Sequence, residues 1–216
     1  MKKKLLVLYF VLCMLFLFGC SSSQKVENVT LHGDVTFGMT KDEVIAKEKE
    51  TGFDLSEEEP FRINASYVLR GEGTIAGVDS SHVTYMFNSD GKLFASCYDF
   101  GYASKNSLDD YEPIEQLLVS KYGKQDSTLF SFIERTGHEP IKYALRLYQT
   151  DFFTPAKCSA WKKKQDDGSY AVITHFVFEA DFLGKLMTYH YVGYQKYTEN
   201  ELNAGADKID KDKNDL

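Results

Sequence analysis

The sequence predicts an α+β fold in which two tandem units each place one helix on an antiparallel sheet. Two helical stretches end at a glycine, several other stretches alternate between apolar and polar side chains, and glycine-containing turns separate the alternating stretches. A helix followed by strands occurs twice, so the repeat lies in the order of elements and not in residue identity. We therefore expect one unit over residues 37–104 and a second over residues 105–197.

The first helix is expected from residue 41 to about Thr51. Thr40 is a good N-cap, and Glu43 stands three residues later, so the two side chains can satisfy free N–H groups of the first turn as a capping box. Gly52 follows and suits the left-handed conformation that commonly ends a helix. These signals fix both ends of the predicted helix.

The strands of the first unit are expected before residue 101. Val83, Tyr85 and Phe87 alternate with polar residues, which is typical of a half-buried strand. The turn at residues 88–91 ends in the glycine that a tight hairpin requires, and its partner strand covers 92–100. Weaker strand candidates lie at 61–70 and 73–78.

The second unit begins with a predicted amphipathic helix within residues 107–122. Its apolar stripe follows the helical period and has Leu117 beside it; the stripe comprises Tyr111, Ile114, Leu118 and Tyr122. Pro113 is tolerated only in the first turn, and Gly123 supplies a stop. Five strands are then expected, with a hairpin turn at 166–169. They cover residues 129–134, 142–149, 156–164, 170–178 and 186–195.

The N-terminus has the organisation of a bacterial export signal. Three lysines follow Met1, and an uncharged apolar run, too short to span a membrane comfortably, extends to Phe18. Leu17-Phe18-Gly19-Cys20 then resembles the lipobox of bacterial lipoproteins, although Phe18 departs from the small or β-branched residue usual there. This predicts a signal peptide over 1–19 and lipid on Cys20, followed by a tether over 20–36. A plain signal peptide with an ordinary Cys20 and an uncleaved anchor are the alternatives.

Charge and location limit the partners of the chain. The formal charge is −7, and removal of Lys2, Lys3 and Lys4 with the signal changes it to −10 (−7 minus 3). Such an acidic body does not suit nucleic acid, whose phosphates require clusters of Lys and Arg. We therefore expect a protein held on the extracytoplasmic face of the cell membrane through lipid on Cys20, with a protein or envelope partner and no nucleic acid.

A short motif carries a family resemblance. The segment from Phe37 to Val44, with Gly38-Met39-Thr40 at its centre, resembles the helix start of the β-lactamase-inhibitor-protein fold and of small outer-membrane assembly lipoproteins. It also resembles uncharacterised lipoproteins of Gram-positive bacteria with this fold. The second unit lacks a clear copy of the motif, since Tyr111-Glu112-Pro113 stands in its place. The resemblance implies tandem helix-plus-sheet units and non-catalytic binding, without any transferable inhibitory residue.

Residue types that carry chemistry are present without a convincing catalytic pattern, so no enzyme and no cofactor is expected. His175 and His190 lie on strands that could be neighbours, but two imidazoles without a third ligand make a weak metal site. Cys97 stands in the middle of a strand, where nothing favours a thiolate nucleophile. Cys97 and Cys158 could form a disulfide in an oxidising compartment, or remain buried thiols.

Aromatic strands provide the candidate binding face. The chain has 14 tyrosines and 16 phenylalanines, and several of the tyrosines fall on strands of the second unit. Trp161, Tyr189 and Tyr191 are expected on a sheet face left uncovered by the single helix, where they could contact a protein; aromatic core residues are the alternative.

The function predicted from these features is a membrane-anchored, non-catalytic binding or envelope-assembly module. A solute-binding lipoprotein serving a transporter, and an envelope hydrolase, are the alternatives. The charged tail over 198–216 contains too few apolar residues to bury and is expected to fray or be disordered past about Asn203.

Overall fold

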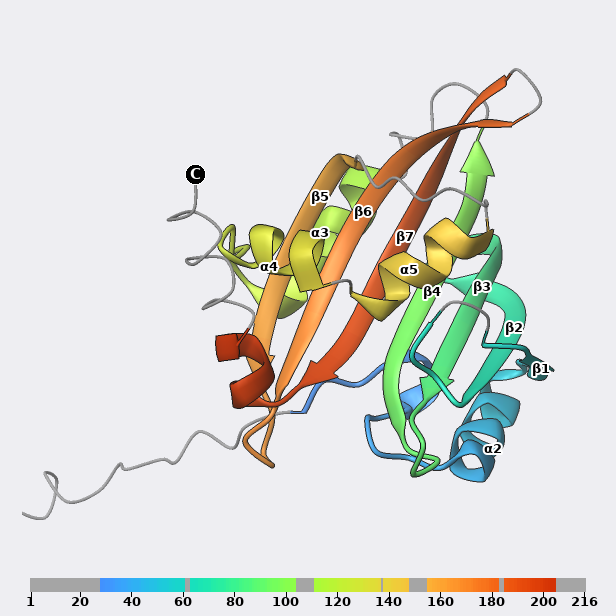
Figure 1. Ribbon diagram of the computed structural model, residues 1–216. Helices are drawn as coiled ribbons and strands as arrows, with labels where there is room; N and C mark the ends of the chain where they lie inside the picture. Colours follow the sequence, from blue (N-terminus) through green and yellow to red (C-terminus); the bar gives the residue numbers. More distant parts are fainter. Residues whose placement is uncertain are drawn as a thin grey trace, which may run out of the picture.

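A computed structural model describes residues 28–60, 63–103, 111–136, 138–147, 155–182 and 185–204. Within them, one seven-stranded antiparallel sheet carries helices on both faces (Figure 1), which confirms the predicted α+β class. The helical elements are η1 (His32–Asp34), α2 (Lys41–Thr51), α3 (Tyr111–Tyr122), α4 (Leu129–Thr136) and α5 (Glu139–Leu147). The strands are β1 (Ser56–Glu58), β2 (Tyr67–Ile75), β3 (Val78–Phe87), β4 (Leu93–Ala103), β5 (Pro155–Lys164), β6 (Tyr170–Phe182) and β7 (Lys185–Tyr197).

The two halves of the chain share this sheet. The strand order is β1-β2-β3-β4-β7-β6-β5, and the halves meet where β4 pairs with β7. The hairpin between β3 and β4 turns at Asn88–Gly91, and the hairpin between β5 and β6 turns after Gln165, as their glycine-containing turns predict. The last strand of the chain therefore lies in the middle of the sheet, between β4 and β6.

Helix α2 begins and ends as predicted. The Thr40 side chain accepts a hydrogen bond from the Glu43 backbone N–H, while the Glu43 carboxylate accepts one from the Thr40 backbone N–H at 2.7 Å. Gly52 ends the helix at φ 89°, in the left-handed region. The helix turns Val44 and Glu48 into the protein interior.

A buried polar cluster fixes α2 to the sheet and to η1. The Glu48 carboxylate is fully buried and accepts hydrogen bonds from the Tyr85 hydroxyl and from the Thr51 hydroxyl, the latter at 3.0 Å. His32 Nδ1 lies 2.8 Å from the same carboxylate. Burial opposes ionisation of Glu48, but the hydrogen bonds from His32 and Tyr85 outweigh it, so the pKa of Glu48 lies below its ordinary value.

Helix α3 covers one face of the sheet, here called the α3 face. The predicted stripe of Tyr111, Ile114, Leu118 and Tyr122 is buried. It packs with sheet residues that include Trp161, Ile173, Val192 and Tyr194, and α2 adds Val44 to the same core. Leu117, expected beside the stripe, is instead 57% exposed, because the helix turns it past the edge of this contact.

The segments 129–134 and 142–149 were expected to be strands, and this prediction is wrong. They belong to α4 and α5, apart from 148–149, which lie outside the described residues. In α4 the buried residues Leu129, Phe132 and Ile133 are spaced i, i+3 and i+4, which is the period of a helix. In α5, Pro140 occupies the first turn, the position in a helix that tolerates proline.

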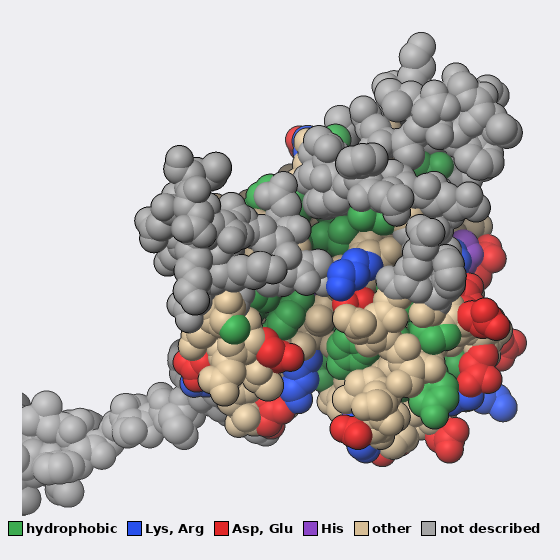
Figure 2. Space-filling view, viewed as in Figure 1, with side chains coloured by type: hydrophobic (Ala, Val, Ile, Leu, Met, Phe, Trp, Pro, Cys, Tyr) green, Lys and Arg blue, Asp and Glu red, His purple; other side chains and the backbone are tan. Residues whose placement is uncertain are grey.

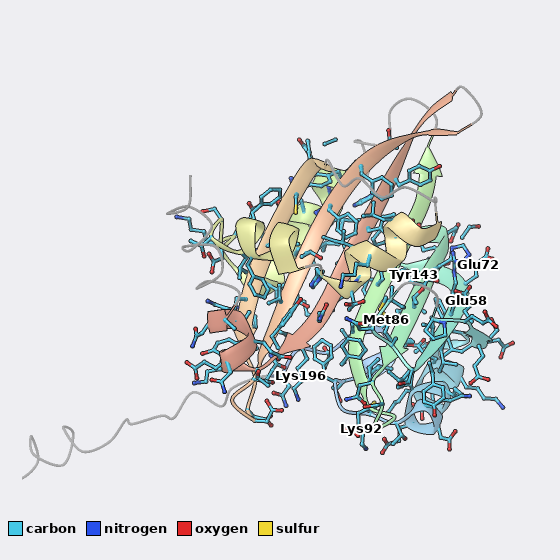
Figure 3. The ribbon with its side chains drawn as sticks, in the orientation of Figure 1. Glu58, Glu72, Met86, Lys92, Tyr143 and Lys196 are labelled. Carbon is cyan, nitrogen blue, oxygen red and sulfur yellow. The ribbon has the colours of Figure 1, made fainter. Side chains whose placement is uncertain are left out.

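Helices α4 and α5 cover the second face, here called the α5 face (Figure 1). Gly193 allows the start of α5 to approach β7, because a Cβ there would lie 2.6 Å from Pro140 Cβ. The Tyr143 hydroxyl of α5 donates to the Glu58 carboxylate of β1 at 2.7 Å. Both side chains are labelled in Figure 3. Both faces of the sheet are therefore covered by helices.

The fold extends further towards the N-terminus than expected. Residues 28–36 were predicted to be part of a tether, but Val29, Leu31 and Val35 are buried, and the Val29 N–H donates to the Gln165 side chain at 2.9 Å. The charged tail begins with a helical turn over residues 199–204, capped by Thr198, which ends close to the residue past which disorder is expected. Residues 205–216 lie outside the described residues.

No helix within the described ranges is both long enough and apolar enough to cross a membrane.

Acidic side chains gather on the β1–β2 side of the molecule in Figure 2, which views the α5 face.

Candidate functional site

An apolar groove opens on the α3 face, between α3 and the tip of the β2–β3 hairpin. The tip contributes Ile75 and Ala76, strand β4 contributes Phe100, and α3 contributes Leu117 and Leu118. The floor comes from Tyr98, Val192 and Tyr194, on the adjacent strands β4 and β7. The groove holds about 470 Å³ of empty space, counting the part that is open to solvent.

The rim of the groove combines an exposed leucine with a lysine. Leu117 is 57% exposed, although it is a large aliphatic side chain on a regular helix. Lys121, one helical turn further along α3, is the one charged residue among those that line the groove, and its ammonium donates to the Thr30 carbonyl at 3.4 Å. Apolar walls with a cation at the edge suit an apolar group that stands next to a carboxylate.

A chain of polar side chains lies beside this groove, beneath the first half of α3. His175 Nδ1 lies 2.5 Å from a Glu115 carboxylate oxygen, and His175 Nε2 lies 2.5 Å from His190 Nε2. The two histidines stand diagonally across the β6–β7 pair, since His175 pairs with Val192 and His190 pairs with Val177. Both side chains are buried.

Two hydroxyl groups complete the surroundings of Glu115. Ser159 donates from Oγ to the Glu115 carboxylate at 2.7 Å, and the Tyr111 hydroxyl lies 3.1 Å from the same Oγ. The Tyr111 ring stacks on His175 with 4.0 Å between centroids and 10° between planes. Gln125 also donates to Glu115. Helix α3 is thus joined to β5 and β6 through a dense polar contact.

The hydrogen-bond geometry assigns the protons. A carboxylate can only accept, so His175 donates from Nδ1 to Glu115; with the imidazole neutral, as its lowered pKa requires, its Nε2 carries a lone pair. His190 must then donate from Nε2 to that lone pair. Burial lowers the pKa of both imidazoles to about 3, with smaller contributions from Lys157 acting on His175 and from His175 acting on His190. Both imidazoles are therefore neutral at pH 7.

This arrangement does not provide an activated nucleophile. The Ser159 hydroxyl donates to a carboxylate, and no imidazole of the described residues is hydrogen-bonded to it as a base. Cys158 is the nearest thiol, and burial raises its pKa to about 12, so it remains protonated at neutral pH. The cluster can hold a proton between its two imidazoles, or pass a proton from one imidazole to the other.

The groove and the polar cluster share helix α3. Ile114 lines the groove and Glu115, the next residue, joins the cluster. Phe100 connects them from the sheet, because its ring lines the groove and lies 5.0 Å from the His190 ring. The position of α3 therefore determines both sites.

The predicted aromatic binding face is wrong. Trp161, Tyr189 and Tyr191 are each at most 3% exposed. Trp161 belongs to the core of the α3 face, whereas the two tyrosines belong to the core of the α5 face. The physical reason is that α4 and α5 cover the face that holds the two tyrosines, whereas Trp161 lies on the opposite face beneath α3.

The two described cysteines are free thiols. Cys97 lies on β4 and Cys158 on β5, with β7 and β6 between them. Three interstrand steps amount to about 14 Å, which is well beyond the reach of a disulfide. The alternative of two unbonded thiols is the one found. Cys20, the predicted lipid attachment site, lies outside the described residues.

Within the described part of the chain, no three or more His, Cys, Asp or Glu side chains gather in a way that could hold a metal ion. The neighbouring placement of His175 and His190, which the strand spacing suggested, is confirmed. Sequence reasoning did not find Glu115 as their partner, nor the groove, since both bring α3 together with strands far away in the sequence.

No family model, curated protein or solved structure matches this chain.

Proposed function

We propose that the chain is an extracytoplasmic binding module, held at the cell membrane by lipid on Cys20, and that its groove on the α3 face binds an apolar segment of a protein partner. The observation that carries this is the apolar groove beside the exposed Leu117, in a chain that is otherwise strongly acidic. Exposed apolar surface concentrated at one recess is typical of an interaction site.

The form of the groove favours a protein segment over a lipid chain. A small-molecule site usually encloses most of its ligand, but this groove is open along one side and would leave much of a long acyl chain in water. One or two apolar side chains of a peptide can fill it, and Leu117 extends the contact beyond the recess. A carboxylate on the same peptide would lie at Lys121.

We further propose that the fold consists of two helix-plus-sheet units that share a sheet, as in the β-lactamase-inhibitor-protein-like lipoproteins that the chain resembles. The support is that α2 precedes β1 to β4 and α3 precedes β5 to β7, with both helices packed on the same face. Helices α4 and α5 are additions that the simple unit does not include.

Leu117→Glu is expected to reduce capture of the partner at least tenfold. The substitution places a carboxylate at the rim of the apolar groove, and it should be tolerated by the fold because Leu117 is largely exposed. Purified protein with each sequence would be immobilised, exposed to detergent extracts of the membranes, and the captured protein quantified by mass spectrometry.

Val119→Glu is the matched control. Val119 is also an exposed apolar residue of α3, at 41%, but it does not line the groove. Capture should be retained by this variant. Equal losses in both variants, or no loss in either, would exclude the groove as the contact. Co-purification of a lipid that Leu117→Glu abolishes would instead assign the groove to an acyl chain.

Cys20→Ser is expected to release the protein from the membrane. Two or three acyl chains on one cysteine give firm attachment, whereas no segment after Cys20 is apolar enough in sequence to replace them. The mature N-terminal peptide of the original chain should begin at Cys20 and carry the mass of the acyl groups. An unmodified Cys20 would contradict the anchor, and so would a Cys20→Ser protein that has lost residues 1–19 and still remains in the membrane fraction.

A further inference from the structure

We propose that the hydrogen-bonded side chains of Glu115, His175 and His190, here called the lock, hold α3 on the sheet at neutral pH. Mildly acidic conditions break these contacts, so that α3 separates from the sheet and the groove is lost. This regulation of the groove rests on the proposed function, but the lock itself is a property of the free protein. Three observations carry it: the contact between the two imidazoles, their burial beneath α3, and the contribution of α3 to both the lock and the groove.

In the closed arrangement, the two imidazoles cannot both be protonated. With His175 donating to Glu115, one proton lies between the two Nε2 atoms, which are 2.5 Å apart. If both imidazoles were protonated, both Nε2 atoms would carry hydrogens directed at each other, and neither could accept. The closed pair therefore cannot hold the proton that would make both rings cationic.

Among the described residues that face the two imidazoles, none offers a second acceptor that would remove this restriction. From α3, Tyr111 stacks on His175 and Glu115 already accepts from it. From β5, Cys158 is held as a thiol by burial, and Lys157 adds a positive charge, with its ammonium 4.7 Å from the Tyr111 ring. From β4, Phe100 faces His190 and does not titrate.

Opening of α3 removes the restriction, because the imidazoles then reach water. An exposed histidine has a pKa of about 6.5, so below that pH the open form takes up protons that the closed form cannot. The closed form is favoured above about pH 6.5, and its advantage declines as the pH falls. With at least one additional proton bound on opening, the opening constant rises about tenfold for each pH unit.

Separation of α3 from the sheet would also remove the groove, because α3 forms one of its walls. Ile114, Leu117, Leu118 and Lys121 all come from α3, and the opposite wall and the floor come from the β2–β3 hairpin, β4 and β7. Once α3 separates from the sheet, the groove no longer exists as a recess. A bound segment would thus be held at neutral pH and released in acid.

Hydrogen exchange of the α3 amides in the full mature chain tests the lock without any partner. After correction for the intrinsic exchange rate, the opening constant of residues 111–122 should rise at least about tenfold per pH unit between roughly pH 6 and 4.5. His190→Gln removes one of the two imidazoles, and its side-chain amide can either donate to His175 or turn its Oε1 to accept from a protonated His175, so the opening constant should rise less steeply over the same range. A constant that does not depend on pH in the original chain, or an unchanged dependence in His190→Gln, would overturn the proposal.

His138→Gln is the matched control. His138 is fully buried on the α5 face, where its Nδ1 lies 3.0 Å from the Tyr197 hydroxyl, and burial lowers its pKa to about 3. Its replacement should leave the pH dependence of α3 intact; if it removes that dependence, the lock is not the pair proposed here. If His190→Gln does not fold, an opening constant of α3 that does not depend on pH in the original chain would still overturn the proposal. Capture of a partner at neutral pH is measured separately, so failure of the groove leaves the exchange result interpretable.

Discussion

Trp161→Ala is expected to lower the free energy of unfolding by about 3–5 kcal/mol, the range typical of removing a large aromatic side chain from a core. Trp161 is 1% exposed and packs in the core beneath α3. Its indole N–H donates to the Gly123 carbonyl at 2.8 Å and so fixes the end of α3 to β5. Urea unfolding followed by circular dichroism measures the loss, and the melting temperature should fall by about 10 °C.

Two variants control this experiment. Trp161→Phe keeps a ring in the core but loses the hydrogen bond, so its loss should be smaller, about 1–2 kcal/mol. Tyr67→Ala removes an aromatic side chain that is 45% exposed on β2, and it should cost less than about 1 kcal/mol. A Trp161→Ala protein as stable as the original would show that this residue is not a core residue and would restore the exposed face first expected for it.

Glu48→Ala is expected to cost a similar amount, about 3–5 kcal/mol, for a different reason. The Glu48 carboxylate accepts from Tyr85, Thr51 and His32, and both Glu48 and Tyr85 are fully buried. Alanine removes the acceptor and leaves the Tyr85 hydroxyl without this partner in the interior, where an unsatisfied polar group is costly. Equilibrium unfolding at neutral pH measures the difference.

The same helix supplies the control for Glu48. Glu50→Ala removes an exposed carboxylate that pairs with Lys47 at 3.6 Å, so its effect should stay within about 0.5 kcal/mol. Glu48→Gln keeps the shape and one acceptor, and its loss should lie between the two. Similar losses for Glu48→Ala and Glu50→Ala would show that the buried cluster does not hold α2 in place.

Local signals in the sequence predicted the elements that local interactions determine. The capping box of Thr40 and Glu43 places the start of α2, and the stripe from Tyr111 to Tyr122 identifies the buried side of α3. Turn glycines place two hairpins, because few other residues adopt the positive φ found at Gly91 and Gly168. None of these conclusions required knowledge of distant contacts.

The second half of the chain was harder because its composition favours strands while its spacing favours helices. Leu129, Phe132 and Ile133 include residue types common in strands, yet their spacing buries one side of a helix. Pro140 was the overlooked signal for the start of α5. This one error had a further consequence, since a sheet without α4 and α5 would have left Tyr189 and Tyr191 exposed.

The candidate site could be predicted only in part. Strand alternation placed His175 and His190 on one face, and their contact follows from the pairing of β6 with β7. Glu115 precedes His175 by 60 residues, and the groove combines α3 with the β2–β3 hairpin and with β7. Contacts of this kind depend on tertiary packing, which a single sequence does not reveal.

The central claim, that the groove on the α3 face binds a protein partner, is tested most directly by photo-crosslinking from two positions of α3. A photoreactive phenylalanine analogue would replace Leu117 or Val119 in the full chain, in intact bacterial cells. We expect a discrete protein adduct from position 117, at the rim of the groove, and none from position 119, which lies on the same helix but does not line the groove. Equal adducts from both positions, an adduct from position 119 alone, or a lipid adduct from position 117 would contradict this claim.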